Sequence, residues 1–138
     1  MHTNIARLVS GLAVAAVLWV WPAADPVAWA GGSLPSEKVC KDESKLPADA
    51  VTRGGCVILH RRKGNCMACH AVPGAGAHGN IAPPLIGMKQ RFPDPARLRA
   101  QIEDPRRFNP KTVMPPFGAN GILTQQEIDQ VVEFLYTL

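Results

Sequence analysis

The sequence predicts a small all-α domain in which three to four short helices are joined by long loops. Three observations favour this fold class. Helix-capping residues precede three segments with helical apolar spacing, and no run of alternating apolar and polar residues indicates a sheet. The stretch from Ala71 to Ile86 is rich in Gly, Ala and Pro, so it is expected to be a loop. A chain of 138 residues also leaves room for only one domain.

The first thirty residues have the three parts of a secretory signal peptide. Met1 to Arg7 is a short, positively charged region, Leu8 to Val20 is largely apolar, and Ala28 to Ala30 has the small-x-small pattern that a signal peptidase recognises. A retained membrane anchor would need about 20 apolar residues, whereas this run has thirteen and Pro22 follows it. We therefore expect residues 1–30 to be cleaved off and the mature chain to be periplasmic.

The mature chain is expected to have two parts. Residues 31–47 are polar, with two Gly and two Pro, and predict an N-terminal extension with little regular structure. Residues 48–138 predict the folded domain. Its first helix is expected from Asp49 to Lys63, with Asp49 as the N-cap. Gly54 and Gly55 each weaken a helix by about 1 kcal/mol relative to Ala, and their expected use is to let another helix approach closely.

Two further helices are predicted. One runs from Asp94 to Asp104, with Pro95 at the first helical position and Pro105 ending it. The other begins at a capping box formed by Thr124 and Glu127. Since a short helix is marginal alone, its apolar face is expected to pack on the first helix. That face has helical spacing and comprises Ile128, Val131, Val132 and Leu135.

A C-x-x-C-H motif carries the chemistry. It reads Cys66-Met67-Ala68-Cys69-His70. Two thiols at this spacing can each add to one vinyl group of a haem, and the adjacent histidine can then reach the iron. A thioredoxin-like motif has the same thiol spacing but needs a βαβ context, and a zinc site needs four ligands. Neither context is visible, so we expect one covalent haem c on Cys66 and Cys69, with His70 as an iron ligand.

The loop after the motif is expected to line one face of the haem. An iron-bound histidine usually donates its other ring N–H to a backbone carbonyl. The Pro83-Pro84-Leu85 segment can supply this acceptor, and the carbonyl of Pro83 is the first candidate.

The second iron ligand must come from the opposite side of the haem. The candidates are Met67, Met88, Met114, His60 and His78. We expect Met114, because its proline neighbours would stiffen the strap that presents the sulfur. The alternative for any of these methionines is a side chain that fills a gap in the core. Methionine opposite histidine raises the reduction potential, and two filled axial positions favour electron transfer over substrate binding at the iron.

Two further cysteines lie outside the attachment motif. In an oxidising compartment Cys40 and Cys56 are expected to form a disulfide, which would stabilise the fold by about 3 kcal/mol. Two buried thiols or one reactive thiol are the alternatives.

The net charge of +4 is compatible with a solvated surface or with docking on an acidic partner. No dense basic tract with interleaved aromatic residues indicates nucleic-acid binding.

These motifs resemble class I cytochromes c. The resemblance rests on the attachment motif, on Ala82-Pro83-Pro84-Leu85-Ile86-Gly87 and on the capped terminal helix. In this family Pro83 would be the carbonyl acceptor for His70, although Ala82 stands where the family usually has Gly. A more specific resemblance is to the SoxX family, through the leader Arg62-Lys63-Gly64-Asn65 and the segment Asn109-Pro110-Lys111-Thr112-Val113-Met114-Pro115-Pro116-Phe117.

The SoxX resemblance implies a subunit rather than a complete enzyme. It implies a heterodimer with a SoxA-like haem subunit, acting as an L-cysteine S-thiosulfotransferase that couples thiosulfate oxidatively to a cysteine of a SoxYZ-like carrier. The catalytic cysteine is expected on the partner, and the present chain would relay electrons from its His/Met haem to a small acceptor cytochrome. The alternatives are a free, diffusible cytochrome c and a haem sensor with an open iron site, the second of which requires Met114 not to bind.

Overall fold

The computed structural model describes residues 32–138, so the predicted signal peptide lies outside the described residues. Within 32–138 the chain is helical and has no strand, apart from a single parallel bridge between His70 and Ala82. No helix in this range is long and apolar enough to cross a membrane. The all-α fold class is therefore confirmed. The elements are α1 (Glu37–Cys40), η1 (Glu43–Lys45), α2 (Ala50–Leu59), η2 (Cys66–Ala68), α3 (Met88–Arg91), α4 (Pro95–Glu103), η3 (Pro105–Arg107) and α5 (Gln125–Leu135).

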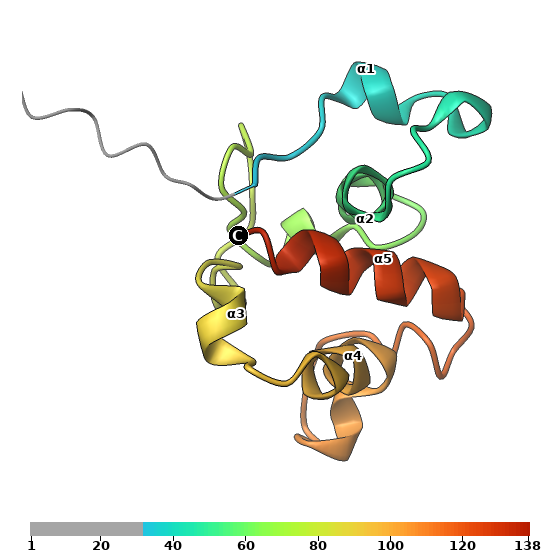
Figure 1. Cartoon of the computed structure of the whole chain (residues 1–138). Helices are drawn as coiled ribbons and strands as arrows, with labels where there is room; N and C mark the ends of the chain where they lie inside the picture. The colour runs from blue at the N-terminus through green and yellow to red at the C-terminus, as the bar shows by residue number, and fades with distance from the viewer. Residues whose placement is uncertain (1–31) are drawn as a thin grey trace, which may run out of the picture.

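The terminal helix α5 forms the centre of the domain, with α2 on one side and α4 on the other (Figure 1). Helix α2 crosses α5 at Gly54, where an added Cβ would overlap the backbone carbonyl of Gln130. The prediction that this glycine permits close helix packing is confirmed. The core between these helices is apolar and almost fully buried; it includes Ile58, Ile128, Val131, Phe134 and Leu135.

Three helix starts are confirmed by their capping contacts. The Asp49 carboxylate accepts from the backbone N–H of Thr52 at 2.7 Å, and the Asp94 carboxylate accepts from that of Ala96 at 2.9 Å. At α5, the Thr124 hydroxyl accepts from the N–H of Glu127 at 3.2 Å while the Glu127 carboxylate accepts from the N–H of Thr124 at 2.9 Å. Each cap satisfies a donor that a helix end leaves unpaired.

Helix α2 ends four residues before the predicted end at Lys63. Its last residue is Leu59, and His60 has an extended backbone conformation. The chain then turns back, because the N–H of Gly64 donates to the carbonyl of Val57 at 3.2 Å and Asn65 has a positive φ of 45°. This turn brings the attachment motif back against the end of α2. A helix that continued to Lys63 would carry the motif away from α2, so the helix ends earlier than predicted.

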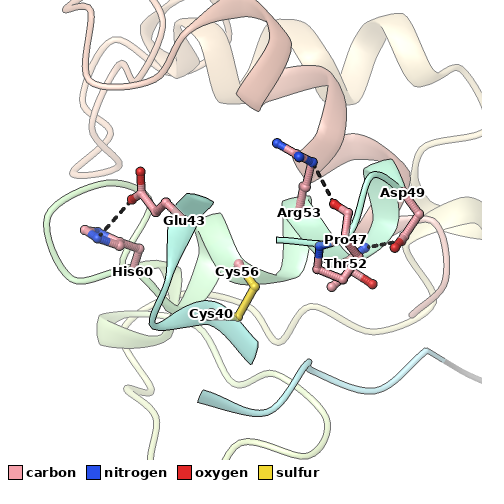
Figure 2. The surroundings of a disulfide bond; sticks show 8 residues. All are labelled: Cys40, Glu43, Pro47, Asp49, Thr52, Arg53, Cys56 and His60. Atoms are coloured by element: carbon pink, nitrogen blue, oxygen red, sulfur yellow. Dashed lines mark hydrogen bonds and ion pairs between the residues drawn. A yellow bond between two sulfur atoms is a disulfide. The ribbon is translucent and has the colours of Figure 1, made fainter. Parts of the chain in front are cut away.

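The prediction of little regular structure before residue 48 is wrong for two short segments. Helix α1 ends at Cys40, and the Asp42 side chain caps η1 by accepting from the N–H of Ser44. A disulfide joins Cys40 to Cys56 on α2, with a Cα–Cα distance of 5.2 Å (Figure 2). Neither α1 nor η1 has a buried residue. The disulfide, the contact of Leu34 with the core and the ion pairs of Glu43 attach this segment to the domain.

Candidate haem site

The attachment motif lies in a tight turn that places its two thiols on one side. Cys66 opens the 3₁₀ turn η2 and Cys69 is its C-cap. Side chains three residues apart eclipse in a 3₁₀ helix, so these two cysteines share a face. The N–H of His70 donates to the carbonyl of Cys66 at 2.9 Å, which keeps the histidine adjacent to both. Cys66 and Cys69 are free and half-buried.

The Gly- and Pro-rich loop wraps around this turn, as expected for residues 71–86. Gly79 donates to the carbonyl of Met67 at 2.7 Å, and an added Cβ at Gly79 would overlap the carbonyl of Ala68. Further along, Ala82 donates to the carbonyl of Cys69 at 3.0 Å. Backbone hydrogen bonds thus join the loop to the motif at two positions, Met67 and Cys69.

The imidazole of His70 is oriented by the loop. Its Nδ1 atom lies 2.6 Å from the carbonyl oxygen of Pro83, the acceptor expected from the sequence. Because a carbonyl can only accept, Nδ1 must carry the proton, which leaves the Nε2 lone pair available for a metal. This tautomer is the one that an axial histidine requires.

Met114 belongs to a strap that packs on the core. The side chain is half-buried, and Phe117 three residues later anchors the strap with 7% of its surface exposed. The N–H of Met114 donates to the hydroxyl of Thr112 at 3.1 Å, and the amide of Gln101 on α4 lies 4.0 Å from the sulfur. The backbone of Met114 is therefore held by Thr112, and its sulfur lies beside Gln101 of α4.

The other candidates for the second ligand have different surroundings. Met88 is only 2% exposed and fills the core beneath α3. Met67 lies within η2 itself. His60 faces Glu43 at 3.5 Å and accepts from the N–H of Arg62, and the ring of His78 lies 3.1 Å from the carbonyl of Gly79. Met114 is the methionine candidate that is partly exposed and lies outside the attachment turn.

The side chains present fit a covalent haem better than the two alternatives. Among the described residues, no three His, Cys, Asp or Glu side chains gather as a metal cluster would require. A thioredoxin-like site needs strands and a lowered thiol pKa, whereas burial raises the pKa of the Cys66 thiol to about 12. Thiols, imidazole and thioether are the donors of a c-type haem. Two exposed apolar side chains are available for contact with a porphyrin. Ile81, next to Ala82 whose backbone pairs with His70, is 70% exposed, and Val113, next to Met114, is 82% exposed.

A groove lies on another part of the described residues and does not include the expected ligand pair. Its volume is about 1320 Å³, and it runs between the N-terminal segment and the outer side of the attachment turn. Residues on its walls include Glu43, His60, Met67 and His78. Neither His70 nor Met114 contributes to it.

Two residues that brace the site were not identified as such from the sequence. Lys63 donates to Glu127 at 2.8 Å and lies 3.3 Å from Glu43, so it links the leader of the motif to α5 and to η1. Arg91 on α3 donates to the carbonyl of Pro84 at 2.7 Å. No local pattern in the sequence indicates these contacts, because the Glu127 partner of Lys63 lies 64 residues away and Arg91 contacts a backbone carbonyl.

Comparison with known proteins identifies the family. Residues 59–135 match the family model described as cytochrome c oxidase, cbb3-type, subunit III. The chain is 40% identical over 76 residues to an uncharacterized lipoprotein of Aquifex aeolicus (strain VF5), a match that covers 54% of this chain and 37% of that protein. The chain thus spans little more than a third of this relative.

A solved structure gives a finer assignment. The crystal structure of SoxXA from P. pantotrophus superposes with a TM-score of 0.57 and 31% identity, covering 63% of this chain and 80% of that one. The family match extends from the end of α2 to the end of α5 and includes the whole attachment motif. The chain belongs to this cytochrome c family, as a SoxX-like member that carries covalently bound haem c.

Proposed function

We propose that the chain is the electron-transfer subunit of a complex similar to SoxXA. The observation that carries the proposal is the hydrogen bond of 2.6 Å between His70 Nδ1 and the carbonyl of Pro83, next to two free thiols. It sets the tautomer that an iron-binding imidazole needs. When bound, the haem supplies a site for one-electron oxidation and reduction.

The proposed ligand set assigns one role to each residue. Cys66 and Cys69 would hold the haem covalently, and His70 and Met114 would be the ligands of its iron. Pro83 orients His70. With His70 and Met114 both bound to the iron, substrate would have no coordination site, so the chain would exchange electrons and would do no bond-making chemistry itself. No catalytic residue is assigned to it.

The proposed source of electrons is thiosulfate coupling on a SoxA-like partner in a heterodimer. Joining thiosulfate to a carrier thiolate forms one S–S bond and releases two electrons. The present chain would relay these electrons, one at a time, to a small acceptor cytochrome. The SoxXA similarity supports this partner, and a SoxYZ-like protein would be the carrier.

The proposed location is the periplasm, after cleavage of residues 1–30. Two observations support it. The N-terminal residues have the composition of a signal peptide, and Cys40 and Cys56 are joined by a disulfide, a bond typical of oxidising compartments.

Native size tests the proposal. The protein is purified from its source by size-exclusion chromatography, and the fractions are stained for covalent haem on a denaturing gel. Co-elution with a second, larger haem protein, together with thiosulfate-dependent reduction of the fraction in the presence of its carrier, is the expected result. Elution of one small haem protein alone would overturn the subunit assignment and favour a diffusible electron shuttle.

A further inference from the structure

We propose that Arg91 is a positioning residue that holds the proline loop against His70 and thereby maintains the hydrogen bond at His70 Nδ1. The inference rests on the proposed role of His70 as an iron ligand. The Nη1 atom of Arg91 lies 2.7 Å from the carbonyl oxygen of Pro84 and 3.4 Å from that of Ile86. Pro84 directly follows Pro83, whose carbonyl is the acceptor for His70.

Prolines make this contact important. A proline has no backbone N–H, so residues 83 and 84 cannot be fixed by donating to a neighbour. Backbone donors hold the loop only outside them, from Ala82 to the carbonyl of Cys69 and from Leu85 to that of Ala71. Between Ala82 and Leu85, the only backbone groups that can form hydrogen bonds are the carbonyls of the two prolines. The Pro83 carbonyl receives His70, and the Pro84 carbonyl receives Arg91.

Arg91 lies on α3, a short helix that is anchored at both ends. The N–H of Met88, at the start of α3, donates to the carbonyl of Leu138 at 3.0 Å, and the Met88 side chain is 2% exposed. After the helix, the carbonyl of Phe92 accepts from the Tyr136 hydroxyl at 2.6 Å. Both ends of α3 are thus tied to the C-terminal end of the chain, near which α3 lies in Figure 1. The Nη1 atom also lies 3.5 Å from the sulfur of Met88, which limits its movement.

The chemistry of the guanidinium suits this role. Arginine keeps its charge at every working pH, and a hydrogen bond from a charged donor is roughly twice as strong as a neutral one. Without it, the Pro83-Pro84 segment gains freedom, and the His70 N–H spends more time exposed to water. The bond at Nδ1 also raises the basicity of the ligand, so its loss weakens electron donation from His70 to the iron.

Exchange of the His70 ring proton with water tests the proposal directly. The rate is measured by NMR on the reduced, haem-loaded protein for wild type, Arg91→Ala, Arg91→Lys and Lys89→Ala. Lys89 is the matched control, because it lies on the same helix and carries the same charge. We expect exchange to be about tenfold faster in Arg91→Ala, from the loss of a hydrogen bond of typical strength, with partial rescue in Arg91→Lys and no change in Lys89→Ala.

Three outcomes are informative. Equal exchange in wild type and Arg91→Ala, or equal acceleration in Lys89→Ala, would overturn the positioning role. If Arg91→Ala fails to fold, as judged by far-UV circular dichroism, unchanged exchange in a folded Arg91→Lys, which lacks the planar fork, overturns it as well. If the wild-type His70 ring shows no haem ring-current shift, the ligand assignment itself fails, and that result is distinct from failure of the Arg91 proposal.

Discussion

The reduction potential expected for the haem depends on the thioether of Met114 as an iron ligand. A methionine opposite a histidine gives a higher reduction potential than a second histidine. We predict that Met114→His lowers the potential by on the order of 0.1 V, within the span that axial ligands cover. Spectroelectrochemical titration measures it.

Met88→Leu is the matched control for Met114. Met88 is 2% exposed in the core, and Leu has a similar volume, so the potential should stay at the wild-type value and stability should fall by less than about 1.5 kcal/mol. A potential that drops in Met88→Leu but not in Met114→His would reverse the ligand assignment.

The site could be predicted from the sequence where its chemistry is local. Cys66, Cys69 and His70 lie within one five-residue motif, and Pro83 follows from the need for a carbonyl near the ring. The roles of Lys63 and Arg91 could not be predicted. Lys63 contacts Glu127 across 64 residues of sequence, and Arg91 contacts a carbonyl, which every residue type has.

Among the elements, the crossing of α2 and α5 sets the tightest limit on side-chain size. A Cβ at Gly54 would overlap the carbonyl of Gln130, so the helices must separate to admit it. We predict that Gly54→Ala lowers the free energy of unfolding by about 1–3 kcal/mol, the usual cost of overpacking, in urea denaturation followed by circular dichroism.

Gly76→Ala is the comparison for Gly54→Ala, because nothing lies within 4 Å of its Cβ position. This change should be neutral, or slightly stabilising through the unfolded chain. Equal stability of the two variants would show that the helices do not approach as closely as described.

The capping box of α5 should also make stability depend on pH. Burial tends to raise the pKa of the Glu127 carboxyl, but hydrogen bonds from Lys63 and Thr124 outweigh it, so the pKa lies below its ordinary value of 4.5. A lowered pKa contributes stability above the unfolded pKa, and this contribution is lost as pH falls through the folded pKa.

We therefore predict that Glu127→Gln costs about 1 kcal/mol near neutral pH and that the cost shrinks as pH falls below 4.5, the carboxyl's ordinary value. Urea is the denaturant, since guanidinium salt would screen the Lys63 pair. Glu133→Gln, at an exposed position of α5, controls for the change of charge. A cost for Glu127→Gln that is independent of pH would mean that the carboxylate contributes through shape alone.

The helices could be predicted wherever a cap and an apolar face coincide, as they do at Asp49, Asp94 and Thr124. Helices α1 and α3 have four residues each, which is too short for helical spacing to show. Helix α1 adjoins the disulfide, and α3 is held by the C-terminal end of the chain. Such segments are formed by tertiary contacts, which a linear pattern does not record.

At the scale of the whole molecule, the disulfide joins two parts that otherwise share few buried contacts. Cys40 lies in the N-terminal segment and Cys56 lies in the core helix, 16 residues later. The remaining links visible around it are polar, such as Glu43 to His60 at 3.5 Å (Figure 2). The cross-link should therefore stabilise the fold chiefly by restricting the unfolded chain.

We predict that Cys40→Ser/Cys56→Ser lowers the free energy of unfolding by about 3 kcal/mol, as expected for a loop of this length. Adding a thiol reductant should bring the wild type to the stability of the double variant. Because the reductant also reduces the haem iron, the double variant is measured with and without it, and the extra loss in the wild type is assigned to the disulfide. Limited proteolysis should then cut the chain between α1 and α2 in the reduced wild type and in the double variant. Resistance to cleavage in both would mean that the other contacts of the N-terminal segment hold it in place, and that the disulfide is dispensable for the fold.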